Sequence, residues 1–294
     1  MKSNKTYLLI IDPQNDFCDL PDISCLPTAD QAEQGPSPAL PVNGAHADMQ
    51  RIATLIDRCS ERIDEIFVTL DSHQHLDIAH PTFWEQEGGS AVNPFTPILA
   101  GDVRAGRYRP RQPEALTRVL AYLDALEATG RYVHMVWPIH CEIGSWGHNV
   151  HSAVRAAYNR WEESRQSNVH KVLKGSNPWT EHYSAISAEV PDPVDEATHT
   201  NRRLIEQLKQ ADRVLIAGEA GSHCVKATTE HLAEQFGPTA LGRLVLLADC
   251  MSPVTGFAAQ YEAFLTSMRA RGLRIMTSVD VITELGATDR VVGV

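Results

Sequence analysis

The chain has 294 residues, a formal net charge of −11 and a sequence pI near 5.6. An acidic protein of this size is not expected to have nucleic acid or an anionic membrane as its main partner, and no apolar run approaches the roughly 18 residues that span a bilayer. With 43% hydrophobic and 21% charged residues, the composition is that of a globular protein. These bounds favour a cytoplasmic enzyme that acts on a small molecule.

Short, nearly continuously apolar runs alternate with helical patterns along the chain. The first run ends at Asp12 and lacks a small-residue cleavage site, so it indicates a buried strand rather than a signal peptide. The predicted strands are 7–11, 66–70, 133–137, 214–218, 244–248 and 273–278. The predicted helices are 46–62, 113–129, 149–166, 199–211, 224–236 and 258–271. This alternation predicts an α/β fold of three αβα layers, with a mostly parallel central sheet of about six strands.

Three stretches interrupt this alternation, near 19–45, 85–112 and 149–172. The first holds five prolines and two glycines and indicates a long loop. No linker divides the chain, so we expect a single domain, 1–294, with insertions at these places. The six cysteines lack CxxC or zinc-finger spacing and do not indicate a disulfide framework.

Polar residues that can do chemistry follow four of the predicted strands in turn. Asp12, Asp71, His140 and Cys224 come after the first, second, third and fourth of them. Because ligands of open parallel sheets bind outside the carboxyl ends of the strands, we expect these side chains to gather at one edge.

A metal site is indicated by Asp71, His73 and His80, in LDSHQHLDIAHPTFW, together with His140. One carboxylate and three imidazoles suit zinc, iron or manganese. Residues 71 and 73 point to the same side of an extended segment, but His75 is in register with His73 and competes as a ligand. A single histidine at a strand end is more often simply solvated, so the hypothesis depends on the group.

A nucleophile is indicated by Cys224, in GEAGSHCVKATTEH, at the start of a predicted helix. A helix N-terminus stabilises a thiolate and offers N–H groups to an oxyanion, although a lone cysteine is more often a buried small residue. Asp12 is either a turn residue or a carboxylate that deprotonates the nucleophile. Lys174, in VLKGSNP, would ordinarily be a solvated surface charge, but near a thiol it would lower the thiol pKa.

Five segments in this order resemble the isochorismatase-like cysteine hydrolases, and among them the nicotinamidases. They are LLIIDPQNDFC (8–18), DSHQHLDIAHPTFW (71–84), VWPIHC (136–141), KG (174–175) with YSA (183–185), and GEAGSHCV (218–225).

The resemblance implies a catalytic triad of Asp12, Lys174 and Cys224. Cys224 would attack the amide carbon of nicotinamide or a close analogue and form a thioester, while Asp12 would pass the thiol proton to the leaving ammonia. Water would then release nicotinate. The protein would thus be an amidase, a hydrolase of linear amide C–N bonds.

The resemblance also implies one divalent metal ion, zinc before iron or manganese, held by Asp71, His73, His80 and His140. It implies a homo-oligomer as well.

An oxyanion hole would come from the N–H groups of Ala220 and Cys224, with a cis peptide between Glu219 and Ala220. Phe17 and Trp137 would line the pocket for the ring.

The chain departs from the family pattern in several places, which bear on the exact amide; one is Gly144-Ser145, where the family usually has Gly-Thr. The spacing from His73 to His80 is longer than usual, Glu142 adds a carboxylate, and Gly221-Ser222 replaces the common Thr-Asp. One alternative is a metal-free amidase of the same fold, acting on another small amide, a ureido or a carbamoyl compound. Another is a non-catalytic binding protein, because a fold does not fix function. Hydrolysis of a vinyl ether needs no cysteine nucleophile and is therefore disfavoured.

Overall fold

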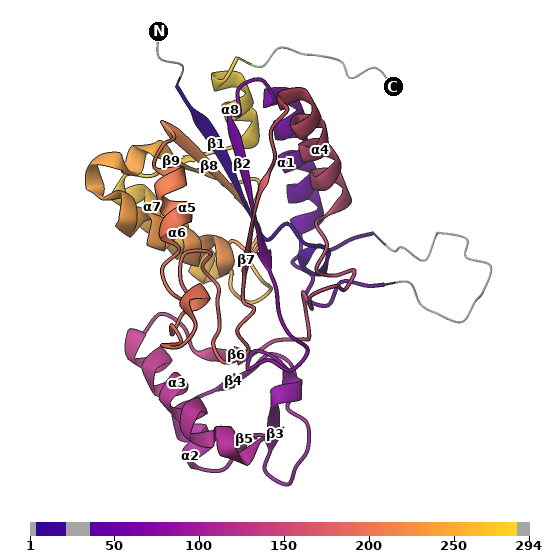
Figure 1. Ribbon diagram of the computed structural model, residues 1–294, viewed down its shortest axis with the longest axis vertical. Helices are drawn as coiled ribbons and strands as arrows, with labels where there is room; N and C mark the ends of the chain where they lie inside the picture. The colour runs from indigo at the N-terminus through magenta and orange to yellow at the C-terminus, as the bar shows by residue number, and fades with distance from the viewer. Residues whose placement is uncertain (1–3, 22–35, 287–294) are drawn as a thin grey trace, which may run out of the picture.

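The structure is a computed structural model that describes residues 4–21 and 36–286 (Figure 1). At its centre lies a six-stranded sheet made of β1 (Thr6–Ile11), β2 (Glu65–Asp71), β7 (His170–Lys174), β8 (Arg213–Gly218), β9 (Leu244–Leu247) and β10 (Arg274–Met276). The order across the sheet is β10–β9–β8–β1–β2–β7, and every neighbouring pair is parallel. The predicted fold class, with a mostly parallel sheet of about six strands, is therefore confirmed.

Helices cover both faces of this sheet (Figure 1). On one face α1 (Ala45–Cys59) packs against α4 (Ser152–Arg165), and α8 (Ser278–Glu284) adjoins α1. The other face carries α5 (Arg202–Leu208), α6 (Cys224–Phe236) and α7 (Ala258–Arg271). These are the three αβα layers predicted from the sequence, although α8 was not among the predicted helices.

The core is centred on β1, whose six side chains are all buried. Its Leu9 lies in register with Phe67 on β2 and Ile216 on β8. A strand that is covered on both faces must be nearly continuously apolar, which explains the sequence of this run. Each fully buried Leu or Ile contributes about 1.5–3 kcal/mol to the free energy of unfolding. This rigid centre fixes the carboxyl end of β1, where Asp12 follows.

A second, smaller core lies in a part of the chain that we call the lower lobe, residues 84–136 (Figure 1). Its elements are β3 (Trp84–Gln86), β4 (Thr96–Ile98), α2 (Ala100–Arg104), β5 (Tyr108–Pro110), α3 (Leu116–Thr129) and β6 (His134–Val136). β3 pairs with β5 and β4 with β6, both antiparallel. The predicted excursion at 85–112 is therefore folded, with Trp84, Leu123 and Val136 buried in its core.

The third predicted strand, 133–137, is wrong as a member of the central sheet. It forms β6, which pairs only with β4 among the described residues. The sheet instead takes β7, from a stretch expected to be helix and loop. β7 is an edge strand, so its side chains are only partly covered, and Leu173 is 65% exposed. Such a strand need not be continuously apolar, which is why the sequence did not reveal it.

The expected insertions have different outcomes. Residues 149–172 supply α4 and part of β7, which belong to the main layers. Most of the loop expected near 19–45 lies outside the described residues. No helix within 4–21 and 36–286 is long and apolar enough to cross a membrane.

Candidate active site

Cys224 is the first residue of α6 and is buried. The turn before it begins at Gly218, which has a φ of +116°, and a Cβ atom there would lie 2.0 Å from the carbonyl oxygen of Ile11. Only glycine permits this close approach. It brings the end of β8 against the end of β1, and therefore brings Cys224 towards Asp12.

Asp12, Lys174 and Cys224 lie together in the structure. The ammonium nitrogen Nζ of Lys174, the last residue of β7, lies 2.9 Å from Asp12 Oδ2 and 3.6 Å from Cys224 Sγ. Asp12 adopts a left-handed backbone conformation, with a φ of 44°, and its Oδ1 accepts a 2.5 Å hydrogen bond from the Thr69 hydroxyl. A strained residue held this firmly is typical of a functional site. Sequence reasoning missed Thr69, although it lies on β2 two residues before Asp71.

The charges of this group follow from its burial. Burial raises the pKa of the Cys224 thiol well above its ordinary value, although Lys174 acts in the opposite direction. Burial alone would lower the pKa of Lys174, but the carboxylates of Asp12 and Asp71 raise it well above its ordinary value. The resting pair is thus a neutral thiol beside an ammonium ion. A base must therefore take the thiol proton. Asp12 is the candidate, because its Oδ2 accepts no aligned hydrogen bond within the described residues and so can accept a proton.

The turn between β8 and α6 contains the predicted cis peptide bond, between Glu219 and Ala220. Ser252 holds both sides of this turn: its N–H donates to Glu219 Oε2 at 3.2 Å, and its carbonyl accepts from the Gly221 N–H at 2.8 Å. A Cβ atom on Gly221 would lie 2.7 Å from the Tyr261 ring. This packing gives a reason for glycine at position 221.

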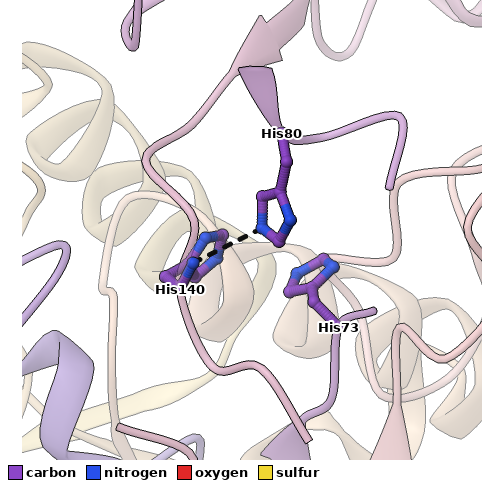
Figure 2. Close-up of side chains that lie close together, drawn as sticks. All are labelled: His73, His80 and His140. Atoms are coloured by element: carbon purple, nitrogen blue, oxygen red, sulfur yellow. Dashed lines mark hydrogen bonds between the residues drawn. The ribbon is translucent and has the colours of Figure 1, made fainter. Parts of the chain in front are cut away.

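Three buried histidines form a cluster beside this group (Figure 2). His73, His80 and His140 each offer one ring nitrogen, and these nitrogens lie within 4.8 Å of one another. In each ring Nδ1 faces an oxygen acceptor: Asp77 Oδ2 at 3.1 Å, the Gln74 carbonyl at 3.1 Å and the Pro138 carbonyl at 2.8 Å. These contacts orient the rings, as in protein metal sites. The His80 Nε2 in addition accepts a 3.4 Å hydrogen bond from the His140 backbone N–H (Figure 2).

Asp71 joins the histidine cluster to the triad. Its Oδ2 lies 3.1 Å from His73 Nε2 and 3.4 Å from His140 Nε2, while its Oδ1 accepts a 2.8 Å hydrogen bond from Lys174. Burial, with His140 and His73 nearby, lowers the pKa of His80 to about 3, so its imidazole is neutral. Three imidazoles and a carboxylate with fixed orientations fit a divalent metal ion such as zinc.

His75, the competing ligand in the sequence, lies outside this cluster. Its side chain is 62% exposed, and its Nδ1 lies 3.1 Å from Glu142 Oε2 in a surface pair. Among the described residues the structure therefore groups His80, and not His75, with His73 and His140.

One small pocket, with a free volume of about 20 Å³, adjoins Cys224 and the histidine cluster. Both residues predicted to line a ring pocket, Phe17 and Trp137, lie in its wall, and the Trp137 indole N–H donates to the Tyr183 hydroxyl at 3.1 Å. The complete lining is Phe17, Leu40, Asp71, Trp137, His140, Glu181, Tyr183, Ala220, His223, Cys224 and Val254. Sequence reasoning missed Glu181 and His223, which lie in irregular segments where no periodicity marks them.

Neither a protein-family model nor a curated protein sequence matches the chain. Solved structures do match it over nearly its whole length. A nicotinamidase and pyrazinamidase from Acinetobacter baumannii is 17% identical with a TM-score of 0.59, covering 96% of this chain and 100% of that chain. The yeast nicotinamidase bound to the inhibitor nicotinaldehyde is 18% identical with a TM-score of 0.60, covering 92% and 99%.

The pyrazinamidase of Pyrococcus horikoshii in complex with zinc is 18% identical with a TM-score of 0.51, covering 93% of this chain and 99% of that chain. An isochorismatase-like hydrolase from Alkaliphilus metalliredigens also matches, with a TM-score of 0.51 and 16% identity. At these identities the likeness shows the fold, and it confirms the predicted resemblance at that level. The chain has the isochorismatase-like hydrolase fold, in the form shared by nicotinamidases and pyrazinamidases.

Proposed function

We propose that this protein is a metal-containing cysteine amidohydrolase that converts nicotinamide, or a close heteroaromatic analogue, to the carboxylic acid and ammonia. The observation that carries the proposal is the single pocket in which Cys224, Asp71 and His140 all take part. The proposed nucleophile and two of the proposed metal ligands thus face the same small volume.

The first half of the reaction transfers the acyl group to sulfur. Asp12 takes the thiol proton as the Cys224 sulfur attacks the amide carbon, and Lys174 stabilises the charges. The N–H groups of Ala220 and Cys224 bind the oxygen that becomes negative. Asp12 then gives the proton to the amide nitrogen, the C–N bond breaks, and ammonia leaves a Cys224 thioester.

The second half returns the enzyme to its starting state. Asp12 takes a proton from a water molecule as the water oxygen attacks the thioester carbon. The C–S bond then breaks, the sulfur regains a proton from Asp12, and the carboxylic acid leaves. The neutral resting thiol that burial favours is the state restored at the end of each cycle.

The binding of the ring is shared between two sets of side chains. Asp71, His73, His80 and His140 would hold a divalent metal ion, which supplies a Lewis acid for the ring nitrogen. Phe17 and Trp137 pack on the ring and exclude water. We propose zinc, because the chemistry of the donor set suits it and the similar P. horikoshii structure is a zinc complex. The expected cytoplasmic location and homo-oligomer remain predictions.

The proposal is tested by the release of ammonia from nicotinamide by the purified protein, before and after a chelator, together with the metal content per chain. We expect release that Cys224→Ala abolishes, and about one metal ion per chain. Release of ammonia by protein free of metal would favour the metal-free amidase. If no heteroaromatic amide releases ammonia, the protein is not the amidase proposed here.

A further inference from the structure

Glu181 lines the reaction pocket, yet neither the acyl transfer nor the metal ligand set uses it. Its side chain is only 4% exposed. One carboxyl oxygen, Oε1, accepts a 3.0 Å hydrogen bond from the His182 N–H. The other, Oε2, is buried and has no hydrogen-bond donor within the described residues. Buried polar atoms are nearly always paired, so this oxygen requires an explanation.

The backbone on both sides of Glu181 is fixed by hydrogen bonds, and the residue is buried away from bulk water. The Glu181 N–H donates to the Tyr122 hydroxyl at 3.3 Å, and its carbonyl accepts from the Glu189 N–H at 2.9 Å. The next carbonyl, that of His182, accepts a 3.0 Å hydrogen bond from Lys174 Nζ. The carboxyl group is thereby fixed one residue away from a group that holds the triad.

Within residues 4–21 and 36–286, no Lys, Arg or His side chain forms an ion pair with Glu181. Burial raises its pKa from 4.5 to about 7; the nearby His73 opposes this rise, while Asp71 and Asp77 add to it. Since the described residues do not supply the missing donor, it comes from water or a ligand in the pocket.

The rest of the wall indicates which kind of occupant can supply it. Phe17, Leu40, Trp137 and Val254 make much of the lining apolar, so a ring bound among them would be oriented by few polar groups. A ring that carries an N–H donor would satisfy Oε2 while its amide faces Cys224. A ring without such a donor would leave Oε2 unpaired. A pocket with an unpaired buried polar group discriminates most strongly against a ligand that lacks the matching donor.

We propose that Glu181 is a specificity-determining residue that accepts a hydrogen bond from an amino group on the ring of the substrate. The preferred substrate class is accordingly an amino-substituted heteroaromatic carboxamide. This inference rests on the proposed function, because it places the amide of that ring at Cys224. It goes beyond that function by assigning a polar contact on the far part of the ring.

The test compares ring-amino nicotinamides with the methyl compounds substituted at the same ring positions, which are similar in size but lack the donor. Binding is measured by calorimetry on metal-loaded Cys224→Ala protein, so that no turnover is needed. At one ring position at least, we expect the amino compound to bind about tenfold or more tightly than its methyl counterpart. In Cys224→Ala/Glu181→Gln this preference should fall to about one, since the glutamine can turn its own NH₂ group to the ligand.

The matched control is Glu189→Gln, which changes another buried carboxyl group with an unpaired oxygen, but one outside this pocket. The control should keep the full preference. Three results would overturn the inference: no amino–methyl pair differs, Glu189→Gln loses the preference equally, or Glu181→Gln loses its metal. Lack of nicotinamide turnover by the unmodified enzyme, with the binding preference intact, would instead count only against the proposed function.

Discussion

The two halves of the pocket are both built from buried titratable side chains, but they balance charge in different ways. In the triad half, the ammonium of Lys174 lies within 3 Å of the carboxylates of Asp12 and Asp71. In the histidine half, three imidazoles face one another, and the carboxylate that they share, Asp71, is also paired with Lys174. The first half contains its own cation, whereas the second is arranged to receive one.

The halves also differ in what holds them. Asp12 and Lys174 follow or end strands of the central sheet, whereas His80 and His140 lie in the segments before β3 and after β6, at the border of the lower lobe. The triad thus depends on the main core, and the histidine cluster depends partly on the smaller one. We therefore expect mutations in the triad half to reduce turnover without loss of metal, and mutations in the histidine half to reduce metal binding.

The largest effect is expected from Cys224→Ala. It removes the only atom that forms the thioester, so turnover should fall by at least roughly 10⁴-fold. The metal content should not change, because Cys224 lies in the other half of the pocket. Ammonia release and metal analysis on the same preparation measure both quantities. Residual activity within tenfold of the unmodified enzyme would show that the cysteine is not the nucleophile.

The next effect in size is that of Lys174→Met, which keeps the length of the side chain and removes its charge. Two buried carboxylates would then face each other without a cation, which should cost about 3–5 kcal/mol of the free energy of unfolding as well as most of the activity. Urea unfolding measures the loss. Adding Asp12→Asn should recover part of the stability but none of the activity. If Lys174→Met alone were as stable as the unmodified protein, the Lys174 charge would not stabilise the two carboxylates.

A smaller effect on activity is expected from His80→Ala, which opens the histidine half. Bound metal should be lost and KM for nicotinamide should rise by roughly ten- to a hundredfold, while the unfolding curve changes little. His75→Ala is the matched control, since that exposed histidine lies outside the cluster and should leave metal content unchanged. The reverse pattern, with metal lost only in His75→Ala, would reject the ligand set proposed here.

The sequence indicated where two residues of the proposed triad lie, because both follow the pattern of a parallel sheet. Asp12 follows a continuously apolar run, and Cys224 opens a predicted helix; both features are local. The placement of Lys174 on a strand of the sheet was not predictable, because β7 is a half-exposed edge strand whose identity depends on pairing with β2.

The sequence was less able to predict which histidines lie together in the histidine half. The alternation that pairs Asp71 with His73 includes His75 equally well, and spacing alone could not exclude it. The structure separates them through contacts distant in the chain, since His75 meets Glu142 at the surface. Glu181 was missed because its role follows from an absent donor, and the absence of a partner becomes visible only when every neighbour is in place.

The last prediction concerns a buried histidine with no metal role, His134 in the lower lobe, which contrasts with the clustered histidines. Burial lowers its pKa from 6.5 to about 4. The folded state therefore binds fewer protons than the unfolded state between these pH values, and acid favours unfolding. The stabilising contribution is complete above pH 6.5 and is lost as the pH falls to about 4, by about 3 kcal/mol in total.

The variant His134→Phe removes this titration while retaining a ring beside Trp84. Its free energy of unfolding should fall less steeply below pH 6.5 than that of the unmodified protein, and its ammonia release at neutral pH should be nearly unchanged. Urea unfolding at a series of pH values gives the comparison. Since His134 lies outside the histidine cluster, metal content should also persist. If the free energy of unfolding depended equally on pH in the two proteins, the protonation of His134 would not contribute to acid unfolding. Loss of metal in the variant would show that the core of the lower lobe affects the histidine half of the pocket.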